Sequence, residues 1–266
     1  MKNKENRRAE IIEMLHKQGP VSINELADRF DVSHMTVRRD VDHLLEVGYV
    51  RRYHGGVRLA EGEARTAYDL RTAEFEHREE KERIAMRAIS LIERGDTLFL
   101  DGGTTTQLIA ERLPNGYDLT VVSSALNIIN LAAQTSGIDV IGTGGVYHES
   151  SGVFEGPEAV ALLSRTRITK AFISANAVQF ELGVTCSYHF EVAGKQAAMR
   201  SSLERILVVD SSKLGRVVSA HFADLSEFDR VIVDRPADTD MVRACLSGPV
   251  RFDFVDAASD SDDEPR

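Results

Sequence analysis

The chain has 266 residues, of which 42% are hydrophobic and 28% are charged, a length that accommodates one large globular domain or two ordinary ones. It contains no apolar run of membrane-spanning length, and no apolar stretch follows its charged first residues, so we expect neither a membrane span nor a secretory signal. Because the chain has two cysteines and no histidine spacing typical of a metal site, a disulfide framework and a zinc site are excluded. We therefore expect a reduced, cytoplasmic protein without a cofactor.

Charge is distributed unevenly along the chain. Residues 1–59 contain 11 lysines and arginines against 9 acidic residues, whereas the remaining residues contain 21 against 33. The net charge of −10 therefore comes from the second part of the chain. It does not argue against a nucleic-acid partner for the first part, because a phosphate backbone interacts with the local charge.

The first 59 residues carry the pattern of three helices followed by a hairpin. Apolar residues recur at helical spacing until Gly19-Pro20 stops them, and Ser22 forms a capping box with Glu25 for a second helix. Alternating residues around Gly55-Gly56 predict a short hairpin. The expected order is a helix over 6–18, a helix over 22–30, a turn at 31–32, a helix opened by Ser33 and ended by Gly48, and a hairpin over 49–59. This order indicates a winged helix-turn-helix.

The third helix is expected to bury its valines and leucines, which leaves polar residues on its outward face. In recognition helices, arginine pairs with guanine and threonine contacts a thymine methyl group or a phosphate, while a basic hairpin reaches the backbone or the minor groove. The expected DNA contacts are Ser33, His34, Thr36, Arg38, Arg39, Arg51, Arg52 and His54. The alternative is that these arginines are ordinary solvated surface residues. The capped turn, the arginine-rich helix and the basic hairpin together favour DNA binding.

The rest of the chain has the pattern of an α/β domain. Residues 59–78 are polar without a sustained period and are expected to be a linker, and residues 251–266 are expected to be a solvated acidic tail. Between them, over 79–250, short apolar runs alternate with segments of helical length, which predicts a parallel, doubly wound sheet. The expected strands are Thr97–Leu100, Leu119–Val122, Asp139–Ile141, Ala171–Ile173, Ile206–Val209 and Val231–Val233.

Small and hydroxyl-bearing residues follow several of these strands. Ligands of open parallel sheets bind beyond the carboxyl ends of the strands, and a helix that begins there offers backbone N–H groups to an anion. The candidates for binding a phosphate and sugar hydroxyls are Asp101, Gly102, Gly103, Thr104, Thr105, Thr106, Ser123, Ser124, Gly144, Gly145 and Lys213. None of these loops is a known nucleotide-binding motif, and each taken singly is more often a tight turn. Their common edge of the sheet favours a binding site.

Glu191 and Lys195 lie four residues apart on an expected helix. This spacing is typical of a surface ion pair. It also supplies the minimum for a sugar-phosphate isomerase, with Glu191 as the base and Lys195 as the charge that stabilises an enediolate. Because a site that only binds hydroxyls and a phosphate needs the same two groups, the spacing leaves these interpretations open.

Several motifs resemble the DeoR family of bacterial transcriptional regulators. The head matches in Val-Ser-His-Met-Thr-Val-Arg-Arg-Asp (32–40) and Arg-Tyr-His-Gly-Gly (52–56). The body matches in Asp-Gly-Gly-Thr-Thr-Thr (101–106), in Glu191 to Lys195 and in Val-Asp-Ser-Ser-Lys-Leu-Gly (209–215). The resemblance implies a winged helix-turn-helix joined to a parallel-sheet, Rossmann-like domain of the ribose-5-phosphate isomerase and CoA transferase type, which binds phosphorylated sugars.

The resemblance also bears on the effector. The resemblance implies an effector site that contains Lys195 in addition to the loop residues. We include Glu191 in the same expected site. Asn176 stands where many members carry an aspartate, so the effector does not follow from those members. The runs Phe172–Val178 and Gly183–Cys186 are similar to the deoxyribose operon branch of the family, which favours deoxyribose 5-phosphate.

Together these features predict an oligomeric regulator, a dimer or larger, that binds double-stranded operator DNA and releases it when a phosphorylated sugar binds. Repression is the expected sign of the response, although activation is equally compatible with the sequence. The competing hypothesis is a sugar-phosphate isomerase-like enzyme carrying a DNA-binding head. The head favours the regulator, for which no catalytic residue is expected.

Overall fold

A computed structural model of the chain describes residues 4–46, 50–53, 56–59, 70–74, 76–234 and 250–255. The chain divides into two compact units, residues 1–78 and residues 79–266. Of the expected features, the DNA contact at His54, most of the linker and the acidic residues after 255 lie outside the described residues. None of the helices that the structure describes is long and apolar enough to cross a membrane.

The first unit contains the expected helices and hairpin. Its elements are α1 (Lys4–Gln18), β1 (Val21–Ser22), α2 (Ile23–Phe30), α3 (His34–Glu46), β2 (Val50–Tyr53), β3 (Gly56–Leu59) and α4 (Leu70–Ala73). The expected capping box is present, since Glu25 N donates to Ser22 Oγ at 3.1 Å and Ser22 N donates to Glu25 Oε2 at 2.8 Å. The winged helix-turn-helix prediction is confirmed.

The wing has one strand more than the sequence predicted. Val21, between the first two helices, pairs with Val57, so that β1, β3 and β2 form one antiparallel sheet. A Cβ at Gly56 would lie 2.3 Å from the carbonyl oxygen of Val21. Position 56 therefore requires a glycine, because β1 approaches the backbone there too closely to leave room for a side chain.

A buried ion-pair cluster ties α1 to α3. The carboxylate of Asp40 is 1% exposed and accepts hydrogen bonds from Arg7 Nε at 2.6 Å and Arg8 Nε at 3.1 Å. Around it, the apolar core of this unit includes Ile11, Leu26 and Val37. Asp40 is thus a structural residue, although it lies in the same motif as the predicted DNA contacts.

The second unit is a parallel sheet covered by helices on both faces. Its elements are α5 (Arg78–Ile89), β4 (Thr97–Leu100), α6 (Thr104–Ala110), β5 (Leu119–Ser123), α7 (Leu126–Ala133), β6 (Ile138–Gly142), β7 (Val146–His148), β8 (Val153–Glu155), α8 (Pro157–Arg165), β9 (Ile168–Ile173), β10 (Ala177–Gln179), β11 (Gly183–Cys186), α9 (His189–Arg200), β12 (Ser202–Val208), η1 (Ser211–Lys213), β13 (Ala220–Ala223), η2 (Leu225–Glu227), β14 (Arg230–Val233) and β15 (Arg251–Phe254). The strand order is β15-β14-β12-β9-β4-β5-β6, and every neighbouring pair is parallel. The predicted α/β architecture is confirmed.

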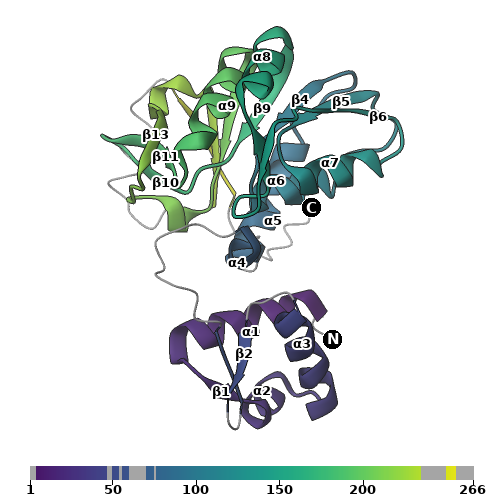
Figure 1. Ribbon diagram of the computed structural model, residues 1–266, viewed down its shortest axis with the longest axis vertical. Coiled ribbons are helices and arrows are strands. Elements are labelled where there is room, and N and C mark those ends of the chain that lie inside the picture. The colour runs from purple at the N-terminus through teal and green to yellow at the C-terminus, as the bar shows by residue number, and fades with distance from the viewer. Residues whose placement is uncertain are drawn as a thin grey trace, which may run out of the picture. The chain divides into compact units, whose positions relative to one another are not determined.

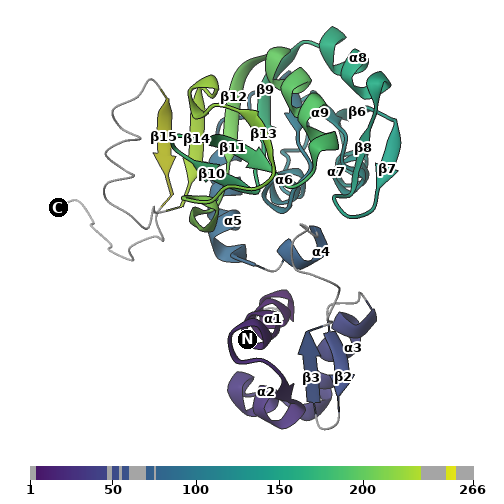
Figure 2. The same ribbon diagram turned by 60° about the vertical axis from the view of Figure 1, so that its left-hand side comes forward.

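The two faces of the sheet bury alternate residues of the same strands. Leu98 and Leu100 pack with α5, α6 and α7, whereas Phe99 between them packs with α8 and α9. Figure 1 and Figure 2 show these two helical layers on opposite sides of the sheet. Since both faces are covered, the central strands read as continuous apolar runs, which is why the sequence reveals them.

The chain order reverses between β4 and β9. From β4 the chain proceeds outward to β5 and β6, and then returns to β9 on the other side of β4. Such a switch point leaves a crevice beyond the carboxyl ends of the two strands, where ligands of this fold class bind. Asp101 follows β4 and Ser174 follows β9 at this place.

Three parts of the second unit differ from the sequence prediction. The hairpin β7-β8 and the small antiparallel sheet β10-β11-β13 were not predicted, and their strands, each three or four residues long, lie outside the parallel sheet. The boundary at residue 250 is wrong, because Arg251–Phe254 pairs with β14 instead of belonging to the tail. Its acidic residue, Asp253, accepts hydrogen bonds from Arg87 at 2.9 Å and Arg230 at 2.8 Å, so its charge is paired in an edge strand.

Candidate functional site

The outward face of α3 carries the polar residues that were predicted to contact DNA. Val37, on the opposite face, is buried as expected. Ser33 caps the helix, since Thr36 N donates to Ser33 Oγ at 3.2 Å and the two hydroxyl oxygens lie 2.9 Å apart. The hydroxyl groups of Ser33 and Thr36 therefore stabilise the first turn of α3. Only part of their hydrogen-bonding capacity is left for a partner outside the helix.

Among the described residues, some basic side chains of this face are paired and others are not. Arg38 and Arg39 are exposed and make no hydrogen bond or ion pair with any described residue, and His34 beside them is also exposed. Arg51 on β2 is exposed as well, whereas Arg52 pairs with Asp42 of α3. The two arginines of α3 are thus available for an anionic partner, while Arg52 also serves to hold the hairpin to α3.

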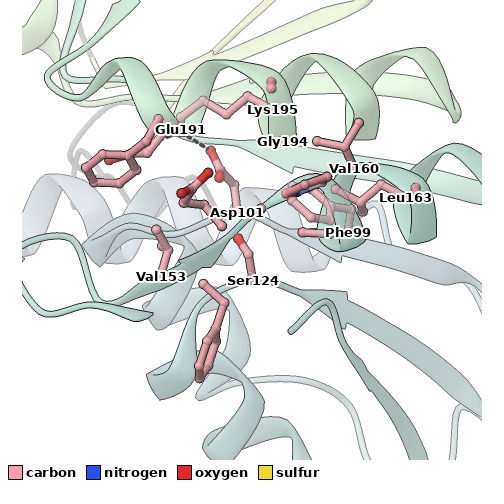
Figure 3. Close-up of a pocket in the computed structure, with 17 residues that line it drawn as sticks. Phe99, Asp101, Ser124, Val153, Val160, Leu163, Glu191, Gly194 and Lys195 are labelled. Atoms are coloured by element: carbon pink, nitrogen blue, oxygen red, sulfur yellow. Dashed lines mark hydrogen bonds and ion pairs between the residues drawn. The ribbon is translucent and has the colours of Figure 1, made fainter. Parts of the chain in front are cut away.

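A cavity of about 370 Å³ lies in the second unit at the switch point of the sheet. It is lined by the carboxyl ends of β4 and β5, by β8, and by the helices α8 and α9 (Figure 3). Its lining residues are Phe99, Asp101, Ser124, Val153, Phe154, Glu155, Gly156, Pro157, Ala159, Val160, Ala161, Leu163, Phe190, Glu191, Ala193, Gly194 and Lys195. This volume falls within the range of small-molecule sites.

Asp101, Glu191 and Lys195 form a charged cluster in the cavity wall. Lys195 Nζ donates to Asp101 Oδ2 at 2.5 Å and to the carbonyl oxygen of Ser174 at 3.2 Å, and lies 3.5 Å from Glu191 Oε2. Burial alone would lower the pKa of Lys195, but the two carboxylates raise it above its usual value, so the ammonium stays charged. The spacing of Glu191 and Lys195 left a surface ion pair and a binding site open, and the structure shows the pair in the cavity wall, with Lys195 3% exposed.

The glycines after β4 allow other segments to reach this cluster. A Cβ at Gly102 would lie 2.4 Å from Val153 Cγ1, and one at Gly103 would lie 2.9 Å from Ser174 Oγ. Asp101 also accepts hydrogen bonds from Ser174 N at 2.9 Å and from Gly102 N at 2.9 Å. Glycine at these two positions thus brings β8 and the end of β9 against Asp101.

Several predicted effector residues are buried and do not line the cavity. Thr104, Thr105 and Thr106 are buried at the start of α6, where Thr106 Oγ1 donates to the carbonyl oxygen of Gly103. Ser123 Oγ donates to Leu100 O at 2.6 Å and accepts from Ala125 N, so its neighbour Ser124 is the serine in the wall.

The other predicted loops do not line the cavity either. Gly144 and Gly145 lead into β7, and a Cβ at Gly145 would lie 2.2 Å from the carbonyl oxygen of Glu155. Their contribution is to let the hairpin carrying Glu155 close on the site. Lys213 lies in η1 and is not part of the lining.

Sequence reasoning missed the segment from β8 to α8 and the aromatic residue before Glu191. Gly156-Pro157 begins α8, and a proline at the first helical position would have been a readable signal. Phe190 lines the cavity and stacks between His148, at 3.9 Å between ring centroids, and Tyr188, at 5.0 Å. No local pattern reveals this stack, because His148 comes from a distant hairpin.

The thiol of Cys186 is buried and lies near the charged cluster. Cys186 is 0% exposed, and burial raises its pKa to about 11. Its thiolate form is therefore scarce at neutral pH.

Glu191 is expected to make the stability of the second unit fall as pH rises. Burial raises the pKa of Glu191 above its ordinary value of 4.5, and the nearby Asp101 adds to this effect. Between pH 4.5 and the raised value the folded chain then binds more protons than the unfolded chain, so the free energy of unfolding decreases through that window. Glu191→Gln removes this dependence.

Urea unfolding of both proteins across that pH range measures the difference. The free energy of unfolding of Glu191→Gln minus that of the unsubstituted chain should increase with pH and then level off. Glu181→Gln, at an exposed position, is the control and should give a flat difference. A flat difference for Glu191→Gln as well would contradict the raised pKa.

Comparison with known proteins agrees with both halves of this description. Residues 7–63 match the DeoR-like helix-turn-helix domain, and residues 76–235 match the DeoR C terminal sensor domain. The lactose phosphotransferase system repressor of Staphylococcus epidermidis is 37% identical over 239 residues, which cover 87% of this chain and 92% of that protein. The HTH-type transcriptional regulator IolR of Bacillus subtilis is 33% identical over 236 residues, covering 89% and 93%.

A solved structure of ribose 5-phosphate isomerase A from Methanocaldococcus jannaschii is similar over 50% of this chain and 53% of that chain, with 18% sequence identity and a TM-score of 0.34. Nothing about the activity of this protein follows from that similarity. The family rests instead on the sequence matches, of which the sensor-domain match alone spans more than half of the chain. With a winged helix-turn-helix in the first unit and this match across the second, the chain belongs to the DeoR family of transcriptional regulators.

Proposed function

We propose that this protein is a repressor of a sugar catabolic operon, which binds operator DNA and leaves it when a phosphorylated sugar binds in the cavity. The observation that carries the proposal is the charged cluster, which lies in a cavity at the switch point of the sheet. Carboxylates accept hydrogen bonds from sugar hydroxyls, and the buried ammonium keeps Asp101 and Glu191 from repelling each other. The relatives named above are regulators, and one of them is named for a lactose system.

The proposed effector site combines the cluster with the strand-end loops that were predicted from the sequence. Ser124 supplies a hydroxyl in the wall, while Gly102 and Gly103 shape the approach to it. Deoxyribose 5-phosphate is the first compound to test, since two runs of the sequence are similar to the deoxyribose operon branch. We further propose a homo-oligomer, because a helix-turn-helix protein gains affinity by reading two half-sites.

A binding assay with DNA and candidate effectors tests the proposal. Purified protein is mixed with a labelled fragment from upstream of its own gene, alone and with a panel of sugar phosphates that includes deoxyribose 5-phosphate. Specific binding that one compound releases would support both parts. If the protein binds the fragment specifically and no compound affects this binding, the proposal that it senses a phosphorylated sugar is contradicted. If it binds random DNA with equal affinity, the fragment does not contain the operator.

An isomerase is the second candidate, because a buried glutamate with a raised pKa beside an ammonium also suits proton abstraction. The test is turnover of pentose phosphates by the full chain, with Glu191→Gln as the comparison. Turnover that disappears in Glu191→Gln would favour the enzyme. Absence of turnover, together with effector-dependent release of DNA, would favour the sensor.

Arg38 is proposed to read a base pair of the operator. It is exposed near the start of α3, and an arginine paired with guanine contributes about 1–3 kcal/mol to discrimination. Arg38→Ala should therefore lose most affinity for the operator and little for unrelated DNA, as measured by competition binding. A uniform loss on all DNA sequences would make Arg38 a phosphate contact instead. Arg94→Ala, at an exposed position of the second unit, is the control.

A further inference from the structure

One stretch of the second unit carries almost no charge. Among the residues from 123 to 147, Asp139 is the only charged one, although 28% of the whole chain is charged. The stretch contains α7, β6 and the start of β7. Figure 1 and Figure 2 show α7 and β6 side by side at one end of the sheet, where β6 is the last strand. This end of an otherwise acidic body is therefore nearly uncharged.

Burial does not explain why the stretch lacks charge. Between residues 126 and 147 only Ile128, Ala132 and Thr143 are buried, and all the others are at least partly exposed. Val146 is 63% exposed and Tyr147 is 44% exposed. We call the exposed residues between 126 and 147 the α7-β6 face. A helix that faces water normally carries charged residues, whereas depletion of charge is typical of the centre of a protein–protein interface.

The edge strand β6 belongs to this face. Among the described residues β6 pairs only with β5, so its other edge has no neighbouring strand there. Charged residues normally protect such an edge from pairing with another chain. The opposite edge strand, β15, has Arg251 and Asp253 among its four residues, whereas β6 has Asp139 alone among five. Of the two edges, β6 is thus the one that is more open to a partner.

A second copy of this chain is the partner that the charge distribution favours. Residues 60–266 contain 21 lysines and arginines against 33 acidic residues, so two copies repel each other over most of this surface. The α7-β6 face is where two such bodies can approach, because a two-fold axis would bring the same nearly uncharged residues together. DNA and a membrane surface would both need lysines or arginines, and residues 123–147 contain none.

We propose that two copies of this chain associate through their α7-β6 faces around a two-fold axis. This inference rests on the homo-oligomer of the proposed function, to which it adds the surface. A standard interface uses about 20–30 residues of each partner, and the segment from 126 to 147 approaches that number by itself. Tyr147 is a suitable anchor, since its ring packs against that of Phe154 at 5.3 Å between centroids and is held in place.

Opposite charges placed on the face test the proposal. Asn130 of α7 and Val146 of β7 are exposed, so a double variant with glutamate at both positions and one with lysine at both should fold. Each double variant brings like charges together, and its association constant should fall at least roughly 100-fold. An equimolar mixture of the two should associate again, because an acidic face then meets a basic face. Sedimentation equilibrium over a concentration series measures these changes.

Leu203→Glu is the matched control. Leu203 is 79% exposed at the start of β12, and three strands separate β12 from β6, so its substitution should leave association unchanged. Circular dichroism checks that each variant is folded. If the double variants dissociate but their mixture does not recover, the α7-β6 face does not meet its own copy, and the proposal is overturned.

The same measurements separate failure of this inference from failure of the proposed function. If the unsubstituted chain is a monomer at every concentration, both the homo-oligomer and the proposed surface are contradicted. If the oligomer persists in both double variants, the surface alone is contradicted. If the chain associates through this face but binds neither the upstream DNA fragment nor a sugar phosphate, the proposed regulator fails and the α7-β6 contact remains.

Discussion

Replacing Asp40 by alanine is expected to lower the free energy of unfolding of the first unit by about 3–5 kcal/mol. The substitution removes the shared acceptor of Arg7 and Arg8, whose side chains are each 11% exposed, and leaves two guanidinium groups with little access to water. The Asp40 carboxylate also joins α1 to α3, so its loss weakens the contact that positions the outward face of α3. Operator affinity is expected to fall with stability.

Urea unfolding followed by circular dichroism measures the change, and Asp42→Ala is the matched control. Asp42 is two residues away on the same helix and pairs with Arg52, but both side chains are more than half exposed. Exposed pairs contribute about 0–1 kcal/mol, so the control should change stability little. Equal effects of the two substitutions would show that burial of the Asp40 cluster does not matter.

Replacing Lys195 by methionine is expected to lower the free energy of unfolding of the second unit by about 3–5 kcal/mol near neutral pH. Lys195 is 3% exposed, and its ammonium is the cation between Asp101 and Glu191. Methionine fills a similar volume but leaves the two carboxyl groups buried without a counter-ion. Acidification should recover part of the loss, because protonated carboxyl groups need no cation.

The measurement is urea unfolding of Lys195→Met and the unsubstituted chain at neutral and at acidic pH. Arg94→Ala is the control, since Arg94 and its partner Asp118 are 72% and 65% exposed and the pair is expected to contribute little. A loss of similar size at both pH values would point to packing rather than to charge. In the effector assay, Lys195→Met should also fail to respond, because the cluster would no longer hold its geometry.

The head was predicted almost completely from the sequence, because its determinants are local. The capping box of Ser22 and Glu25 acts over three residues, and the apolar spacing of α3 specifies which face is buried. The third strand of the wing escaped prediction, since Val21 becomes a strand only by pairing with Val57, far along the chain.

The central strands of the body were also predicted, although β9 begins three residues and β12 four residues earlier than expected. Lys170 and Glu204 interrupt the apolar runs of β9 and β12, yet both lie within these strands, where they pair with Asp96 at 2.7 Å and Arg230 at 3.1 Å. Charged residues can occupy strand ends when a neighbouring element supplies the partner. Composition alone therefore underestimates strand length there, as it did for Arg251–Phe254.

The sequence by itself determined the helices of the head, the parallel sheet and the edge of that sheet where a site would lie, because these depend on residue spacing and on strand ends. Only the tertiary structure decided which polar residues meet at that edge. Asp101 and Lys195 are 94 positions apart and touch because β4 lies beside β9, under α9. Ser123 instead faces the backbone of Leu100, since no periodicity states where a side chain points once its strand has ended.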